Sequence, residues 1–314
     1  MTIRWVRTMI ACAMVLAAFR CARKEPAEAP KPDQAAAVKA PKAVEEKPQP
    51  YTYPAPVKGH FKEINVGSFG VVDGIAYKGG AGTVVVASSK PIASPMLAGS
   101  PCPMTAARSL IALRDASFLE VTLDTAGRSR YFVAGNAFGG TSREEASGSR
   151  SWSSKLKAAP GRASGSVRHT HGNFEFDLAV LTPAAAEVSQ GDWVQGKRSN
   201  ASLTRPTEQA VTAAYRAAHD AALKKDWKAL LAPIGFGEKE SSAIRGLEGI
   251  DADLAVYAGR FLQPGNPEEF TAENGKAYVR GEGTNSKGKK FANFYHFAPC
   301  GDRLVLVSIA ENPQ

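Results

Sequence analysis

Apolar and polar positions alternate in short runs from Phe61 to Trp193, and Gly, Pro and Ser separate the runs. The clearest run is Asn173–Leu181, where Phe174 and Phe176 share one face and charged residues occupy the other. A period of two is typical of an antiparallel strand with one wet face. Many such strands predict a β-sandwich or an open barrel over residues 59–198. The other elements expected here are strands Val71–Tyr77, Gly82–Ala87, Ser117–Leu123, Ser129–Ala134 and Gly165–His171 and a helix over Thr105–Leu113.

The period changes after Gln195–Pro206, a polar stretch without periodicity. From Thr207 onward apolar residues recur every three or four positions, which predicts a helix with Thr207 as its N-cap. We also expect a helix over Ser241–Ala258, although Gly246 and Gly249 weaken it. Residues 205–314 therefore predict an α+β domain. Its closing strands are expected at Lys276–Glu282, Lys290–Ala298 and Leu304–Ala310.

Two sequence stretches of this second domain resemble a known family. A helix with the sequence AYRAAHDAALKKDWKALLAP (214–233), further helix and a final meander ending in RLVLVSIAEN (303–312) resemble the NTF2-like fold, named after nuclear transport factor 2. More narrowly, they resemble small domains of uncharacterised bacterial envelope lipoproteins. The resemblance implies a sheet curled around helices to form a conical pocket. The segments AFGG (137–140) and HGNFEFDLAVLTP (171–183) are similar to a β-rich module of secreted proteins, which implies no known activity.

The first 58 residues predict where the protein is located. Arg4 and Arg7 precede Thr8–Phe19, an apolar run that is typical of an export signal and shorter than the ~20 residues of a membrane-spanning helix. Residues 22–58 consist mostly of Ala, Pro, Lys and Glu, a composition that predicts a disordered tether. We therefore expect residues 1–21 to be a signal peptide or lipoprotein leader and the protein to reach the bacterial cell envelope.

Cys21 follows the apolar run, as the acylated cysteine of a lipoprotein does. Arg20 departs from the small residue that such signals carry just before the cysteine, so lipidation at Cys21 is one of several alternatives. The others are an uncleaved anchor and a wrongly assigned start codon. Either kind of anchor predicts attachment to a membrane.

The formal net charge of +9 is spread over the chain and does not indicate nucleic-acid binding. The segment Arg150–Arg168 is basic and contains no acidic residue, but Trp152 is its single aromatic residue. A nucleic-acid interface would combine a concentrated positive face with several stacking aromatics. A solvated loop, or contact with anionic lipid or polysaccharide, fits this segment better.

Cys102 and Cys300 are the two cysteines that follow the leader, and both lie in turn sequences. In an oxidising compartment such a pair can form a disulfide that joins the two halves of the chain. Two free thiols are the alternative.

His169 and His171 are two positions apart on an expected strand, so both face the same way, together with Glu175 and Asp177. Imidazole and carboxylate ligands suit Zn²⁺ or Cu²⁺, but the carboxylates would lie up to ~25 Å from His169. The alternative is a solvated face of the sheet.

His219 and Asp220 lie on the first helix of the second domain, and His296 lies on one of its strands. A general base inside an NTF2-like pocket would have to be one of these groups, and His219 with His296 is the best catalytic pair of the chain. A buried histidine with one hydrogen bond is the structural alternative. No phosphate loop, dinucleotide fingerprint or Cys-x-x-Cys motif is present, so we expect no cofactor.

These observations predict a tethered envelope protein that binds a partner or a small apolar ligand without catalysing a reaction. A periplasmic isomerase or hydrolase that uses His219 is one alternative, and a metal-binding envelope protein is another.

Overall fold

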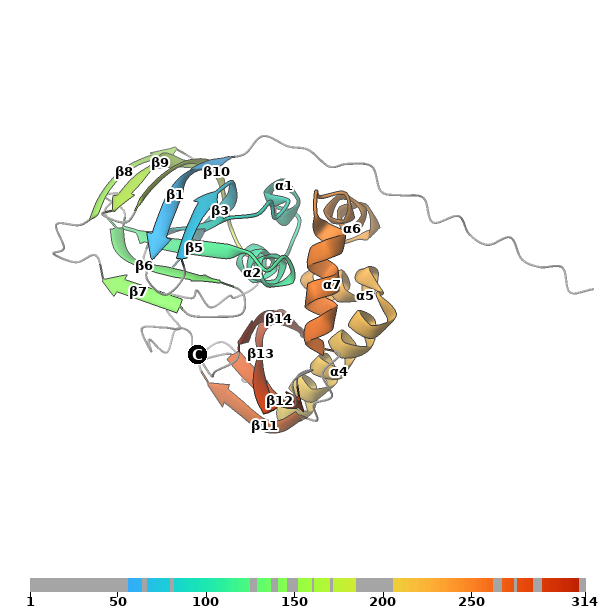
Figure 1. The fold of residues 1–314 in the computed structure, drawn as a ribbon. Coiled ribbons are helices and arrows are strands. Elements are labelled where there is room, and N and C mark those ends of the chain that lie inside the picture. Colours follow the sequence, from blue (N-terminus) through green and yellow to red (C-terminus); the bar gives the residue numbers. More distant parts are fainter. Residues whose placement is uncertain are drawn as a thin grey trace, which may run out of the picture. The chain divides into compact units, whose positions relative to one another are not determined.

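The computed structural model describes residues 56–63, 67–79, 82–124, 129–136, 141–145, 152–159, 161–169, 172–184, 206–261, 267–273, 276–284 and 290–310. Residues 47–314 form one compact unit. The leader and most of the predicted tether, including Cys21, lie outside the described residues. The expected NTF2-like pocket and the domain boundaries at 198 and 205 stay predictions. What the structure shows is a β-rich part together with helices (Figure 1).

Ten strands of the β-rich part join into one mixed sheet in the order β2-β1-β10-β3-β4-β5-β6-β7, and β9 pairs with both β10 and β8. All described pairings are antiparallel except that of β10 with β3, which is parallel. The strands are β1 (Val57–Glu63), β2 (Gly67–Val71), β3 (Asp73–Gly79), β4 (Gly82–Ser88), β5 (Ser117–Leu123), β6 (Ser129–Asn136), β7 (Thr141–Glu145), β8 (Trp152–Ala159), β9 (Arg162–His169) and β10 (Gly172–Leu181).

The sheet has two leaves that enclose an apolar interior. One leaf contains β1, β2, β8, β9 and β10, and its buried side chains include Phe61, Phe174 and Phe176. The other leaf contains β3 to β7 and contributes Val85 and Leu119 to the same interior. The alternation predicted for Asn173–Leu181 is present in β10, whose exposed and buried residues alternate from Asn173 to Ala179.

The first strand begins earlier than the sequence pattern indicates. Val57 is 1% exposed and pairs with Phe176, so Val57 and Lys58 belong to the sheet and not to the predicted tether. A single apolar residue between charged and Pro-rich neighbours gives no period-two signal, and therefore sequence analysis missed this strand.

Helix α2 (Pro103–Leu113) lies at the centre of the molecule. Every residue of this helix except Arg108 is buried, which fits a sequence without a polar face. Helix α2 contacts β3 of the first sheet, and it also contacts α7 (Ile250–Phe261) and β14 (Arg303–Ala310), so the helix is covered by both parts of the chain. The short helix α1 (Ser94–Leu97) precedes it.

The C-terminal part begins with helices. As expected, Thr207 caps the first one, accepting a hydrogen bond from the Ala210 N–H. The single helix predicted over Ser241–Ala258 is wrong. The chain forms two helices there, because Gly246 caps the first and Gly249 adopts a left-handed conformation (φ 73°) before the second. The elements are α4 (Glu208–Lys224), α5 (Trp227–Leu231), the 3₁₀ turn η1 (Ala232–Ile234), α6 (Glu238–Arg245) and α7 (Ile250–Phe261).

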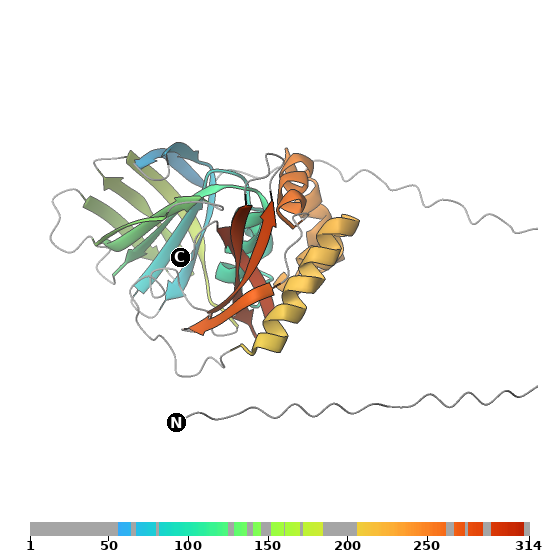
Figure 2. The same cartoon turned by 60° about the horizontal axis from the view of Figure 1, so that its bottom comes forward.

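Four strands, and not the three expected, follow in the order β11-β12-β13-β14. Helix α4 runs along one face of this antiparallel sheet and contacts β11, β12 and β14 (Figure 2). The additional strand is β11 (Pro267–Glu273). It precedes β12 (Lys276–Thr284), β13 (Lys290–Cys300) and β14 (Arg303–Ala310).

One apolar core connects the two parts of the chain. It contains Ile75 and Val86 from the first sheet, Leu110 from α2, and Tyr215 and Tyr295 from the C-terminal part. Strand β4 (GTVVVAS) reads as a continuous apolar run because both of its faces are covered, one by each core.

Candidate functional site

Three tyrosines from three elements meet between the helices and the C-terminal sheet. Helix α4 provides Tyr215, α7 provides Tyr257 and β13 provides Tyr295, and each is at most 3% exposed. The rings of Tyr215 and Tyr295 are 4.8 Å apart and meet edge to face. We call these three side chains the tyrosine cluster.

Hydrogen bonds fix the hydroxyl groups of Tyr295 and Tyr215. The Tyr295 hydroxyl donates to the Arg260 carbonyl oxygen at 2.9 Å and also bonds with the side chains of Tyr215 and Asn293. Asn293 is itself buried. The cluster is therefore a buried part of the apolar core in which a few polar groups are held in fixed directions.

Burial raises the pKa of all three phenols. Desolvation is the main cause for Tyr215, Tyr257 and Tyr295, and the charge of Tyr215 would raise the pKa of Tyr295 further. The cluster consequently stays protonated and neutral well above neutral pH. In that state its hydroxyl groups can orient a polar atom of a ligand, but they do not supply a base.

His219 adjoins the cluster from the same face of α4. Its ring lies 6.1 Å from the Tyr215 ring, and its side chain is 28% exposed. Nδ1 of His219 lies 3.3 Å from Oδ1 of Asp220, whose side chain is 64% exposed. The histidine that sequence analysis selected is thus at the edge of the interior and its carboxylate neighbour is in solvent.

His296 lies on β13 and is 4% exposed. It follows Tyr295 directly, and consecutive side chains on a strand leave opposite faces of the sheet. Tyr295 is the residue whose ring reaches α4, so His296 points to the face away from α4 and His219. The catalytic pairing of His219 with His296 stays a prediction, and the geometry of β13 weighs against it.

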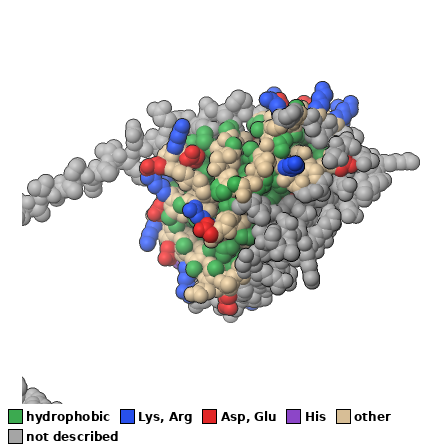
Figure 3. All heavy atoms as spheres, turned by 180° about the vertical axis from the view of Figure 1, so that it is seen from behind, with side chains coloured by type: hydrophobic (Ala, Val, Ile, Leu, Met, Phe, Trp, Pro, Cys, Tyr) green, Lys and Arg blue, Asp and Glu red, His purple; other side chains and the backbone are tan. Residues whose placement is uncertain are grey.

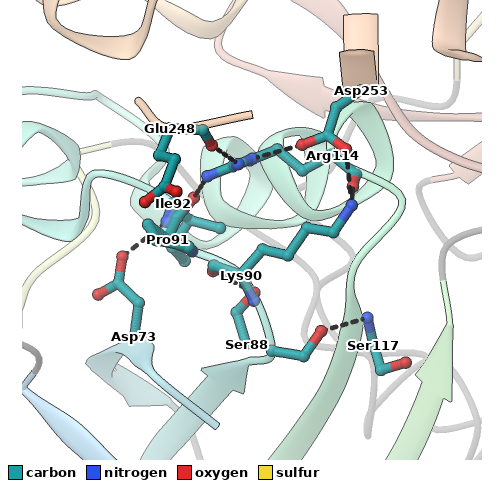
Figure 4. A network of polar contacts seen from close by, with 10 residues as sticks. Asp73, Ser88, Lys90, Pro91, Ile92, Arg114, Ser117, Glu248 and Asp253 are labelled. Carbon is teal, nitrogen blue, oxygen red and sulfur yellow. Dashed lines mark hydrogen bonds and ion pairs between the residues drawn. The ribbon is translucent and has the colours of Figure 1, made fainter. Parts of the chain in front are cut away.

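A second polar cluster joins the end of α2 to α7 (Figure 4). The Arg114 side chain is 3% exposed, and its Nε donates to Oδ2 of Asp253 at 2.9 Å. Its two terminal nitrogens donate to the carbonyl oxygens of Pro91 and Glu248, both at 2.5 Å. Lys90 donates to the other Asp253 oxygen at 2.6 Å. Each of the three guanidinium nitrogens therefore donates a hydrogen bond that holds loops and helices together.

Asp73 has a similar structural role beside this cluster. Its buried carboxylate accepts hydrogen bonds from the backbone N–H groups of Gly74 at 2.7 Å and Ile92 at 2.6 Å. A buried carboxylate that receives backbone donors fixes a loop, in this case the segment that follows β4.

The structure joins Cys102 and Cys300 in a disulfide with a Cα–Cα distance of 5.7 Å across 198 residues of sequence. Cys102 is the N-cap position of α2, and Cys300 is the last residue of β13. The bond therefore ties the central helix covalently to the C-terminal sheet.

The predicted metal ligands are only partly visible. His169 ends β9 and pairs with Gly172, whereas His171 lies outside the described residues. Asp177 pairs with Ser164, which is five positions along β9 from His169. The carboxylate of Asp177 forms an ion pair with Arg162 at 2.6 Å. Among the described side chains, no three His, Cys, Asp or Glu residues are grouped closely enough to hold a metal ion. Metal binding at His169 and His171 stays a prediction.

Sequence analysis did not find the tyrosine cluster or the pair of Arg114 with Asp253. Tyr215 falls on the apolar face of its helix, which was a usable signal. Tyr257 and Tyr295 come from separate elements, and only their packing brings them to Tyr215.

The chain matches no family model, no curated protein and no solved structure. Among the described helices, none combines the length and the apolar character that crossing a membrane requires.

Proposed function

We propose that this chain is an exported, tethered protein of the bacterial cell envelope that binds a partner or a small apolar ligand without catalysis. The observation that carries the proposal is the disulfide between Cys102 and Cys300. Disulfides persist in oxidising compartments and are rare in the cytosol, so the bond supports the location that the leader and the tether suggest.

The tyrosine cluster supports binding over catalysis. Its hydroxyl groups are neutral hydrogen-bonding groups, and raised pKa values keep them so at physiological pH. His219 is the nearest candidate base. Its carboxylate neighbour, Asp220, is exposed to solvent. An apolar ligand with one polar atom matches this environment better than a proton-transfer reaction does.

The order of elements supports the proposed NTF2-like character of residues 205–314. Helices α4 to α7 precede a four-stranded antiparallel sheet, and α4 lies against that sheet with Tyr215 on Tyr295. This arrangement is compatible with the resemblance given above for the same residues. In the proposed function the side of the sheet that faces α4 forms the ligand-binding interior.

The location can be tested by fractionating bacteria that express the full chain and labelling thiols under non-reducing conditions. We expect a shortened protein in the envelope fraction in which Cys102 and Cys300 resist a thiol reagent until a reductant is added. A Cys102→Ser/Cys300→Ser variant, made on the same background, is the control for labelling at other cysteines. Full-length protein in the cytoplasm with reactive thiols would refute the proposal.

Binding can be tested separately by native mass spectrometry of protein purified from envelopes. We expect an added mass or a co-purifying partner, and a weaker signal in Tyr215→Phe and Tyr295→Phe variants. A hydrolase or isomerase activity that disappears in His219→Ala would instead support the enzymatic alternative.

A further inference from the structure

The leaf made of β8, β9, β10, β1 and β2 turns one face to solvent, and positively charged side chains predominate on that face. Six cations project from it, all exposed: Lys155 and Lys157 on β8, Arg162 and Arg168 on β9, and Lys58 and Lys62 on β1. Three strands contribute to this set, which we call the basic face. No single sequence segment contains it.

The strand register shows that these side chains lie on one surface. Lys155 pairs with Ser166, Ser166 with Glu175, and Glu175 with Lys58, so four neighbouring strands form one row. Paired residues share a face, and strands lie about 4.8 Å apart, so the row spans about 14 Å. Arg168 lies in the next row on the same side, with Asn173 and His60, and Lys62 lies one row further along β1.

Little negative charge offsets these cations. Asp177 is the partner of Arg162, in an exposed bidentate pair with both distances at 2.6 Å. Among the described side chains of this face, five further cations then stand against one further carboxylate, Glu175. The remaining neighbours in these rows are small or neutral, including Ser164, Ser166 and Asn173.

The helical side of the molecule differs in this respect. Residues 207–245 contain six basic and five acidic side chains. Acidic and basic side chains lie beside one another along the margin of the helical side (Figure 3). Among the described residues, the positive excess therefore distinguishes the basic face from the helical side.

We infer that the basic face docks on the surface of a bilayer that contains anionic phospholipids. The described positions of this face hold no large apolar side chain and no Phe, Tyr or Trp. The exposed His60 lies between Lys58 and Lys62 and is hydrogen-bonded to Ser68. Charge complementarity is therefore the interaction that the face offers. Each Lys or Arg near an anionic bilayer contributes ~1 kcal/mol, and several together give measurable binding. β1 is also the first strand after the predicted tether, so in the proposed function this leaf is the part of the sheet closest to the anchor along the chain.

Binding of the purified full chain to vesicles tests the inference. One set of vesicles contains phosphatidylcholine alone, and the other also contains phosphatidylglycerol. A quadruple variant carries Lys58→Gln, Lys62→Gln, Lys155→Gln and Lys157→Gln. A matched control carries Arg216→Gln, Lys224→Gln, Lys225→Gln and Lys239→Gln on the helical side. Both variants lose four charges and keep the same leader and tether, so any leader-driven binding is common to both.

We expect the native chain and the control to bind the anionic vesicles more tightly than the neutral ones. The basic-face variant should lose about tenfold or more of the anionic-vesicle binding. About 1 M salt, where the Debye length is ~3 Å, should abolish the preference for anionic vesicles. Equal binding to both vesicle types, or equal loss in both variants, would overturn the inference.

A soluble acidic polysaccharide serves as a second probe. If it binds to the native chain but not to the basic-face variant while anionic vesicles do not bind, the partner is a polysaccharide and the bilayer inference is wrong. The inference rests on the proposed function for the identity of the membrane. Vesicle binding is measured on purified protein, so its failure is distinguishable from a failure of export in cells.

Discussion

Arg114 and Asp253 are 139 positions apart in the sequence, and Nε of the arginine lies 2.9 Å from Oδ2 of the aspartate. Arg114 directly follows α2, and Asp253 lies in the first turn of α7. At the other end of α2, Cys102 is bonded to Cys300. Both ends of the central helix are thus held by the C-terminal part of the chain.

Arg114→Met should destabilise the protein by about 2–4 kcal/mol. The substitution leaves the carbonyl oxygens of Pro91 and Glu248 without their donor and removes one partner of Asp253, while Lys90 still neutralises that carboxylate. Urea denaturation of the purified protein measures the loss. Combined with Asp253→Asn, the two effects should be less than additive, because the pair acts as a unit.

The exposed pair of Arg162 with Asp177 provides the control for this experiment. Its side chains are 64% and 53% exposed, so solvent screens the pair, and Arg162→Met should lower the free energy of unfolding far less than Arg114→Met does. A loss at Arg162 as large as that at Arg114 would contradict the role of burial.

Reduction of the disulfide should lower the stability of the folded chain without changing its fold. A bond across 198 residues restricts the unfolded chain strongly, and native disulfides contribute about 2–5 kcal/mol. Thermal unfolding with and without a reductant measures the difference. The Cys300→Ser variant should unfold at the lower temperature in both conditions, and a response of this variant to reductant would show that another bond is responsible.

The tyrosine cluster predicts a loss of stability at alkaline pH. Burial in the folded protein raises the pKa of each phenol above its ordinary value of 10.0. The contribution of these phenols to stability is complete at pH values below the pKa that they have in the unfolded chain. It falls as the pH rises above that pKa, because the unfolded chain then releases protons that the folded chain keeps. The free energy of unfolding should fall by ~1.4 kcal/mol per pH unit for each such phenol.

Denaturant titrations at a series of pH values from neutral to alkaline measure this slope. A Tyr295→Phe variant removes one titrating phenol, so its slope should be shallower by about one proton. In the folded native chain, the absorbance of tyrosinate should rise at a higher pH than in the unfolded chain. If the variant and the native chain have the same slope, groups other than Tyr295 cause the loss of stability at alkaline pH.

The sequence predicted the elements whose signal is local. β10 alternates cleanly, and α4 carries both a capping threonine and an apolar face, so both were located closely. Gly246 and Gly249 weaken the helix expected over Ser241–Ala258, but no local signal shows that one of them ends a helix and the other precedes the next.

Relationships that depend on packing could not be derived in the same way. The parallel pairing of β10 with β3 and the sharing of α2 between two sheets have no local signature. Burial of Arg114 is equally hidden, since an arginine at the end of a short helix is ordinarily exposed. The basic face was seen only in part, because Lys58 and Lys62 come from a strand that the pattern did not predict.

Gly59 gives a sharp test of the register between β1 and β10. Its φ is 155°, and a Cβ added there would lie 2.2 Å from the Asn173 carbonyl oxygen and 2.5 Å from Phe174 Cα. These are backbone atoms of the paired strand, so Gly59→Ala should force the strands apart and cost about 2–4 kcal/mol.

Gly70 on β2 is the matched control, because the nearest atom to its added Cβ is the Gly59 carbonyl oxygen at 3.7 Å. Gly70→Ala should be neutral or stabilise slightly by reducing the entropy of the unfolded chain. Urea denaturation compares the two variants, and equal effects at both positions would show that β1 does not approach β10 as closely as the register requires.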